Sequence, residues 1–154
     1  MMQWLAERDC EYVEQPLEEG NEENLSYLFK NRPLPIFVDE SCRFASDIPK
    51  WAEYVDGVNL KLMKCGGVTG ALQIISTAKA FGLKTMIGCM GETSISIAAG
   101  ASISGVLNHI DLDSHLNLNP DPCEGAPLVN EVITPPNIPG HGGRFKNQFA
   151  PSSQ

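Results

Sequence analysis

Short apolar runs that end in a charged residue recur along this chain at a nearly regular interval. Glu14 and Asp39 are 25 residues apart, Asp39 and Lys61 are 22 apart, and Lys61 and Asp111 are 50 apart, with a further apolar run at residues 85–88 between the last two. An interval near 25 residues is the length of one β-strand and one crossover helix. The pattern therefore predicts parallel strands that alternate with helices and carry charged side chains at their carboxyl ends.

About five such strand-helix units fit into this sequence, whereas a complete eight-unit barrel takes about 200 residues or more. We therefore predict an α/β fold that is the C-terminal part of a (β/α) barrel of the TIM type and lacks the first strands. Residues 1–116 are expected to form this partial barrel. Residues 117–154, which are rich in Pro, Gly and Asn, are expected to form an irregular C-terminal tail that packs on the barrel. Active sites of such barrels lie at the carboxyl ends of the strands, where the charged residues occur.

Signals for helix ends place the helical segments between these strands. Gly82 is well suited to the position after a helix, and acidic residues near position 22 suit a helix start. One further strand is expected near residues 128–133. Helices are expected over five segments, namely residues 2–9, 21–29, 46–53, 69–81 and 92–104.

Composition and charge exclude several classes of protein. With 42% hydrophobic and 19% charged residues, the chain has the composition of an ordinary globular protein. A net charge of −8 argues against a nucleic-acid partner or an anionic membrane surface. No apolar run approaches the roughly 20 residues that span a bilayer, and the first residues show no signal peptide. The five cysteines form no C-x-x-C pair, so we expect reduced thiols in a cytoplasmic protein.

The alternation of side chains along a strand predicts which polar residues share a face. Burying such residues together is costly unless they are paired, bound to a metal or placed at the open mouth of a barrel. Each of them alone has a plain alternative as a solvated or ion-paired residue. The residues expected on the inward face are Asp39, Asn59, Lys61, His109, Asp111 and Asp113.

A possible catalytic arrangement follows from the order of these residues. Glu14 and Asp39 end neighbouring strands, which lie about 4.8 Å apart, so their carboxylates can share one hard cation such as Mg²⁺. Lys61, one strand further on, would lie beside the cation and would have a lowered pKa, which suits a general base. A metal ion and a lysine together indicate abstraction of a proton next to a carboxylate, with the cation stabilising the enediolate.

Other residues near these positions have structural interpretations. Lys64 is expected on the face opposite Lys61, as a surface or loop-anchoring lysine. His109 is expected to be a packed, hydrogen-bonded histidine. Gly66 and Gly67 suit either an anion cradle at a helix start or a tight turn from strand to helix.

Several motifs, taken together and in order, resemble the muconate-lactonizing subgroup of the enolase superfamily. Within that subgroup the sequence is most similar to the L-Ala-D/L-Glu epimerases, which are dipeptide epimerases. The resemblance covers nearly the whole chain, from about residue 4 to residue 140. The motifs that carry it are Tyr12-Val13-Glu14-Gln15-Pro16, Val38-Asp39-Glu40-Ser41, Asn59-Leu60-Lys61-Leu62-Met63-Lys64-Cys65-Gly66-Gly67, Gly88-Cys89-Met90-Gly91-Glu92-Thr93 and Asp111-Leu112-Asp113.

The resemblance implies specific roles for five residues. Glu14 and Asp39 match two of the family's three Mg²⁺ carboxylates. Lys61 matches the acid/base lysine of the sixth barrel strand, which acts on one face of the substrate α-carbon. Asp111 and Asp113 match the pair on the eighth strand that holds the ammonium group of a dipeptide. The implied function is a Mg²⁺-dependent dipeptide epimerase with a small dipeptide as substrate.

The sequence also departs from the family pattern. The family's first Mg²⁺ carboxylate, its K-x-K motif on the second strand and its N-terminal capping domain are not found in these 154 residues. We therefore expect the chain alone to be inactive and to need a missing N-terminal half or association into a homo-oligomer. Two alternatives stay open at this point. One is an N-acylamino acid racemase or cycloisomerase of the same superfamily, and the other is a non-catalytic half-barrel that needs a partner chain.

Overall fold

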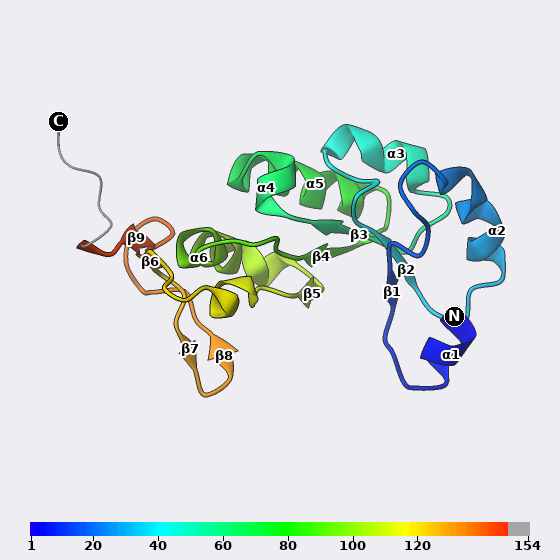
Figure 1. Cartoon of the computed structure of the whole chain (residues 1–154). Coiled ribbons are helices and arrows are strands. Elements are labelled where there is room, and N and C mark those ends of the chain that lie inside the picture. The colour runs from blue at the N-terminus through cyan, green and yellow to red at the C-terminus, as the bar shows by residue number, and fades with distance from the viewer. Residues whose placement is uncertain (148–154) are drawn as a thin grey trace. The chain divides into compact units, whose positions relative to one another are not determined.

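The computed structural model describes residues 1–147. The chain contains two compact units, the first formed by residues 1–86 and the second beginning at residue 87. Strands alternate with helical segments up to residue 117, and short strands follow after it (Figure 1). Five strands are hydrogen-bonded in chain order: β1 (Val13–Glu14), β2 (Ile36–Val38), β3 (Gly57–Leu60), β4 (Lys84–Ile87) and β5 (His109–Ile110).

The strands of the first unit are parallel and buried. Val13 of β1 pairs with Ile36 of β2, and Val38 of β2 pairs with Val58 of β3. All three residues of β2 are fully buried, as expected for a parallel strand that is covered on both faces. The main-chain N–H of Lys84 donates to the carbonyl oxygen of Asp56 at 3.0 Å, which places β4 beside β3. The predicted parallel order of the strands is therefore confirmed for this unit.

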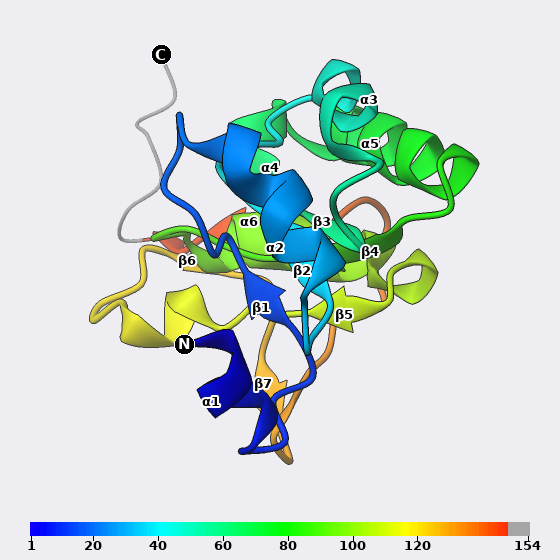
Figure 2. The ribbon, with the colours of Figure 1, turned by 90° about the vertical axis from the view of Figure 1, so that its right-hand side faces the viewer.

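Parallel strands require crossover connections, and short helices provide them here. In the first unit, α2, α3 and α5 lie on one side of the strands in two perpendicular views (Figures 1 and 2). The prolines at positions 33 and 35 follow α2, where a helix cannot continue. The helical segments of this unit are α1 (Met2–Ala6), η1 (Glu22–Asn24), α2 (Leu25–Lys30), η2 (Ala45–Asp47), α3 (Ile48–Trp51), α4 (Leu62–Cys65) and α5 (Val68–Ala80).

The longest helix, α5, forms where the sequence predicted one. Gly67 precedes it with a φ of 95° and Gly82 follows it with a φ of 72°. Both angles lie in the left-handed region that glycine adopts at no steric cost. The N–H of Leu83 reaches back to the carbonyl oxygen of Ala78 at 2.9 Å and closes the last turn. Its buried residues recur with helical spacing, at positions 71, 74, 75 and 78.

The second unit contains one main helix and several short elements. The helix α6 (Ser94–Ile103) lies within the predicted segment 92–104, and its buried residues include Ile97, Ala98 and Ala101. The other elements are η3 (Ser104–Val106), β5, η4 (Ser114–Asn117), β6 (Cys123–Glu124), β7 (Leu128–Val129), β8 (Val132–Ile133) and β9 (Arg144–Phe145).

The prediction of a single strand near residues 128–133 is wrong. The segment is a hairpin in which β7 pairs antiparallel with β8. Asn130 and Glu131 make the turn with φ values of 50° and 65°, and two left-handed residues are what a tight hairpin turn requires. The usual glycine is absent from this turn, so the sequence carried only a weak signal for it.

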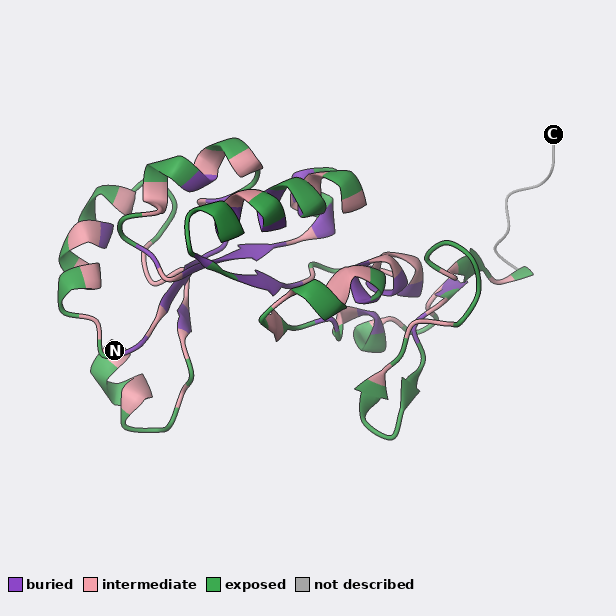
Figure 3. Ribbon diagram, turned by 180° about the vertical axis from the view of Figure 1, so that it is seen from behind, coloured by how far each residue is buried: buried purple, intermediate pink, exposed green. Residues whose placement is uncertain are grey.

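The buried residues are distributed according to the helices and strands. Buried residues of the first unit gather on its strands and on the helix faces turned toward them (Figure 3). None of the helices in the described residues 1–147 is long and apolar enough to cross a membrane. The packing of residues 117–154 on the partial barrel stays a prediction, and residues 148–154 of that segment lie outside the described residues.

Candidate active site

The first unit brings three predicted site residues together at the carboxyl ends of adjoining strands. Glu14 is the last residue of β1, Asp39 follows β2, and Lys61 follows β3. The ammonium group of Lys61 donates to Oδ2 of Asp39 at 2.6 Å. The Asp39 side chain is 4% exposed and that of Lys61 is 16% exposed. This ion pair is therefore shielded from water on most sides.

Asn59 connects Glu14 to the third strand. Its Nδ2 donates to Oε1 of Glu14 at 2.6 Å, and Asn59 is almost completely buried. Its Oδ1 is buried and has no hydrogen-bond partner among the described residues. The sequence placed Asn59 on the same face as Lys61, but its contact with Glu14 was not predicted.

Lys64 lies beside Asp39, and the prediction that it would occupy the face opposite Lys61 is wrong. Strand alternation ends with β3, and α4 begins at Leu62. One helical turn then returns the residue three positions after Lys61 to the same side. The ammonium group of Lys64 donates to Oδ1 of Asp39 and, at 2.7 Å, to the main-chain oxygen of Asp39. The anchoring role expected for Lys64 is thus present, but its anchor is a candidate metal ligand.

Gln15 fixes the main chain on the other side of Asp39. The main-chain N–H of Asp39 donates to Oε1 of Gln15 at 2.8 Å. The Nε2 of Gln15 donates to Oγ of Ser41 and to the carbonyl oxygen of Leu17, each at 2.8 Å. Gln15 itself has a φ of 39°, which is rare for a residue with a side chain. Its position directly after Glu14 was the only signal in the sequence for this contact.

The pKa values of Glu14 and Asp39 are shifted in opposite directions. Burial raises the pKa of Glu14; the hydrogen bond from Asn59 opposes this shift and the neighbouring Asp39 adds to it. Burial would also raise the pKa of Asp39, but hydrogen bonds from Lys61 and Lys64 outweigh it and hold the pKa below its usual value. Of these two carboxylates, Asp39 is therefore the one that stays ionised to lower pH.

The pKa of Lys61 is set mainly by burial and by Asp39, which act in opposite directions. Burial would lower its pKa, but the hydrogen bond and charge of Asp39 outweigh burial and raise it. Glu40, which directly follows Asp39, adds to this effect.

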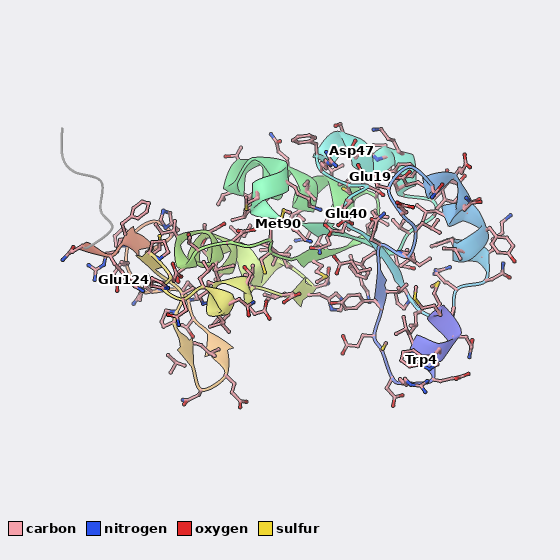
Figure 4. The ribbon with its side chains drawn as sticks, viewed as in Figure 1. Trp4, Glu19, Glu40, Asp47, Met90 and Glu124 are labelled. Carbon is pink, nitrogen blue, oxygen red and sulfur yellow. The ribbon has the colours of Figure 1, made fainter. Side chains whose placement is uncertain are left out.

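Glu40 lies on the side of the strands that carries α3, together with Glu19 and Asp47, whereas Trp4 lies on α1 on the other side (Figure 4).

The donor set at the strand ends fits Mg²⁺. Glu14 and Asp39 offer carboxylate oxygens, which are the ligands that Mg²⁺ prefers. The Oδ1 of Asn59, the residue whose Nδ2 binds Glu14, is a further buried oxygen without a partner among the described residues. Burial is the largest cause of the raised pKa of Glu14, and a bound cation would stabilise the charged form that burial disfavours.

The second unit brings together the other predicted pair, Asp111 and Asp113. Both side chains are exposed, and Leu112 between them is buried, as strand alternation predicts. The thiol of Cys89 lies 3.9 Å from Oδ1 of Asp113. One ligand atom from each of Cys89, Asp111 and Asp113 lies within 4.8 Å of the others. Exposed acidic groups at this spacing can bind a cationic group of a ligand.

Comparison with known proteins identifies close relatives. The family described as Enolase C-terminal domain-like matches residues 1–149. A protein of Flavobacteria bacterium named hydrophobic dipeptide epimerase is 65% identical over 149 residues, covering 97% of this chain and 43% of the relative. This chain therefore spans less than half the length of that relative.

Solved structures show the same similarity. A substrate-liganded complex of the L-Ala-D/L-Glu epimerase from Bacillus subtilis matches with a TM-score of 0.84 and 30% identity, over 92% of this chain and 42% of that one. A dipeptide epimerase from Enterococcus faecalis, complexed with Mg and the dipeptide L-Leu-L-Tyr, matches with a TM-score of 0.83 and 34% identity, over 92% and 42%. These matches and the parallel strands confirm the predicted fold class, part of a TIM-type barrel.

Proposed function

Since the chain belongs to the Enolase C-terminal domain-like family, we propose that it supplies part of the active site of a Mg²⁺-dependent dipeptide epimerase. Such an isomerase inverts the α-carbon of the C-terminal residue of a dipeptide. The observation that carries the proposal is the cluster of Glu14, Asp39 and Lys61 at the ends of adjoining strands. The 65% identical relative, named hydrophobic dipeptide epimerase, supports a dipeptide with apolar side chains as substrate.

Each residue of the cluster has a proposed role. Glu14 and Asp39 would hold Mg²⁺, which when bound would stabilise the negative charge that develops on the substrate carboxylate. Lys61 would remove the α-proton from one face of the substrate at Nζ and return a proton to that face in the reverse direction. Inversion needs a second base on the opposite face. These 154 residues contain no K-x-K motif, so we propose that another segment or a partner chain supplies that base.

The second unit would supply the contact that selects a dipeptide. Asp111 and Asp113 are exposed acidic groups close to each other, and a dipeptide has an ammonium group that needs an anionic partner. An N-acylamino acid or a muconate has no free α-ammonium group. In this proposal the two residues would distinguish a dipeptide epimerase from the racemase and cycloisomerase alternatives.

A chimera tests the proposed function. The segment of the Flavobacteria relative that matches this chain over 149 residues is replaced by this chain, and epimerisation of L,L-dipeptides with apolar side chains is followed by chiral chromatography. We expect turnover that is lost in Lys61→Ala and retained in the exposed control Lys79→Met. A folded chimera that binds Mg²⁺ but epimerises no dipeptide would contradict the proposal.

The same chimera tests the substrate class. Replacing both Asp111 and Asp113 by Asn removes the proposed anionic partner without a large change in volume. We expect loss of dipeptide turnover with unchanged Mg²⁺ affinity. Unchanged dipeptide turnover, or new activity on N-acylamino acids as the main activity, would favour the racemase alternative instead.

A further inference from the structure

The two carboxylate oxygens of Asp39 are each bound by a lysine, but the two lysines are held differently. Lys61 donates to Oδ2 of Asp39 at 2.6 Å. Lys64 donates to Oδ1 of Asp39, to its main-chain oxygen at 2.7 Å and to the main-chain oxygen of Asn59 at 3.4 Å. A lysine with several acceptors, two of them on the main chain, has a fixed position that a lysine with a single side-chain partner lacks.

The backbone around Lys64 fixes this position further. The N–H of Lys64 donates to the carbonyl oxygen of Lys61 at 2.9 Å, and that of Gly67 donates to the carbonyl oxygen of Leu62 at 2.9 Å. Gly66, with a φ of 82°, ends the turn. The side chain of Lys64 is 11% exposed, less than that of Lys61. The short helix α4 therefore presents Lys64 to Asp39 from a closed turn.

We propose that Lys64 is a positioning residue that holds the Asp39 carboxylate in its orientation, so that Lys61 can leave Asp39 and act on substrate without loss of the candidate metal site. The proposal rests on the proposed function, which assigns Asp39 to the metal and Lys61 to the substrate. Lys64 also connects the two candidate metal ligands. Its contact with the main chain of Asn59 joins the residue that holds Asp39 to the residue that holds Glu14.

The affinity for a metal ion distinguishes a positioning lysine from a lysine that acts only through its charge. A lysine that acts only through its charge competes with a cation for Asp39, so its removal strengthens metal binding. A positioning lysine has the opposite effect, because loss of an outer contact to a metal ligand typically costs 10–100-fold in metal affinity. The two lysines beside Asp39 are therefore expected to differ in the sign of their effect.

The first experiment measures Mn²⁺ binding to the 154-residue chain by electron paramagnetic resonance of the free ion. We expect Lys64→Met to weaken binding by about 10-fold or more, Lys64→Arg to restore most of it, and Lys61→Met to leave it equal or tighter. Lys79→Met, at an exposed position of α5, is the matched control, and circular dichroism checks the fold of each variant. Equal or tighter binding by Lys64→Met would overturn the proposal.

A second experiment needs no metal and separates this proposal from the proposed function. Urea unfolding of single and double variants measures how strongly each lysine is coupled to Asp39, using Asp39→Asn with Lys64→Met and with Lys61→Met. We expect the coupling, as a fold-change in the unfolding constant, to be several-fold larger for Lys64. Equal coupling, or larger coupling for Lys61, would overturn the proposal. A wild-type chain that binds no Mn²⁺ would contradict the proposed metal site. The unfolding coupling between Lys64 and Asp39 would then decide whether Lys64 positions Asp39.

Discussion

Asn59 donates a 2.6 Å hydrogen bond to Glu14, although 45 residues separate the two in the sequence. The bond joins the first and third strands of the parallel sheet across the strand that leads to Asp39. It gives Oε1 of Glu14 a fixed donor. The orientation of Glu14 thus depends on a neutral residue that no metal or proton-transfer pattern would single out.

Substitutions of Asn59 test this dependence. Asn59→Leu keeps the approximate volume, removes the buried oxygen that has no partner among residues 1–147, and leaves Glu14 without its donor. Asn59→Asp places a second carboxylate against Glu14. We expect Asn59→Leu to lower the free energy of unfolding by about 1–3 kcal/mol and Asn59→Asp to lower it more, because a buried carboxylate at position 59 would face the like charge of the partly buried Glu14. Urea unfolding at pH 7 measures both, and a smaller loss for Asn59→Asp would contradict this account of the contact.

The pH dependence of stability is expected to show two carboxylates with opposite effects. Asp39 has a pKa below its ordinary value of 3.8, so its stabilising effect is present above that value and is lost as the pH falls through its lowered pKa. Glu14 has a pKa above 4.5, so its ionisation reduces stability as the pH rises from 4.5 through its raised pKa.

Urea unfolding between pH 2 and pH 7 checks both signs. Asp39→Asn should flatten the loss of stability below about pH 4, and Glu14→Gln should flatten the decline above pH 4.5. A profile unchanged by Asp39→Asn would show that its ion pairs with Lys61 and Lys64 do not persist in solution.

Much of this arrangement could be predicted from the sequence, because it depends on strong periodic signals. The interval between Glu14 and Asp39 predicted their neighbouring strand ends, and Gly82 predicted the end of α5. The position of Lys64 could not be predicted, because strand alternation was extended past the point where α4 begins. The hairpin at residues 128–133 was missed because Asn130 and Glu131 adopt left-handed angles although neither is a glycine.

The cysteines are expected to fall into two reactivity classes. No disulfide joins any of the five, all of which lie within residues 1–147. Cys42 is 1% exposed, and burial together with Asp47 raises its pKa to about 12. About one thiol in 10⁴ of this kind is ionised at pH 8, so it reacts slowly even when reached. Cys65 and Cys123 are buried as well, whereas Cys10 and Cys89 are partly exposed.

Titration with a chromogenic disulfide reagent at pH 8 measures this difference. We expect fast reaction at Cys10 and Cys89, each lost in its serine variant, and reaction of the other three only after addition of denaturant. Fast reaction of Cys42 in the native chain would contradict the packing of the β2–α3 region.

The central claim is that Lys61 acts on one face of the substrate α-carbon. Its most direct test is exchange of the α-proton in D₂O, followed by proton NMR, in the chimera with the Flavobacteria relative. With Lys61→Ala, we expect exchange to be lost for one epimer of the dipeptide and retained for the other, because the base on the opposite face is unaffected. Retained exchange for both epimers, or loss of both in a variant that still binds Mg²⁺, would contradict this role for Lys61.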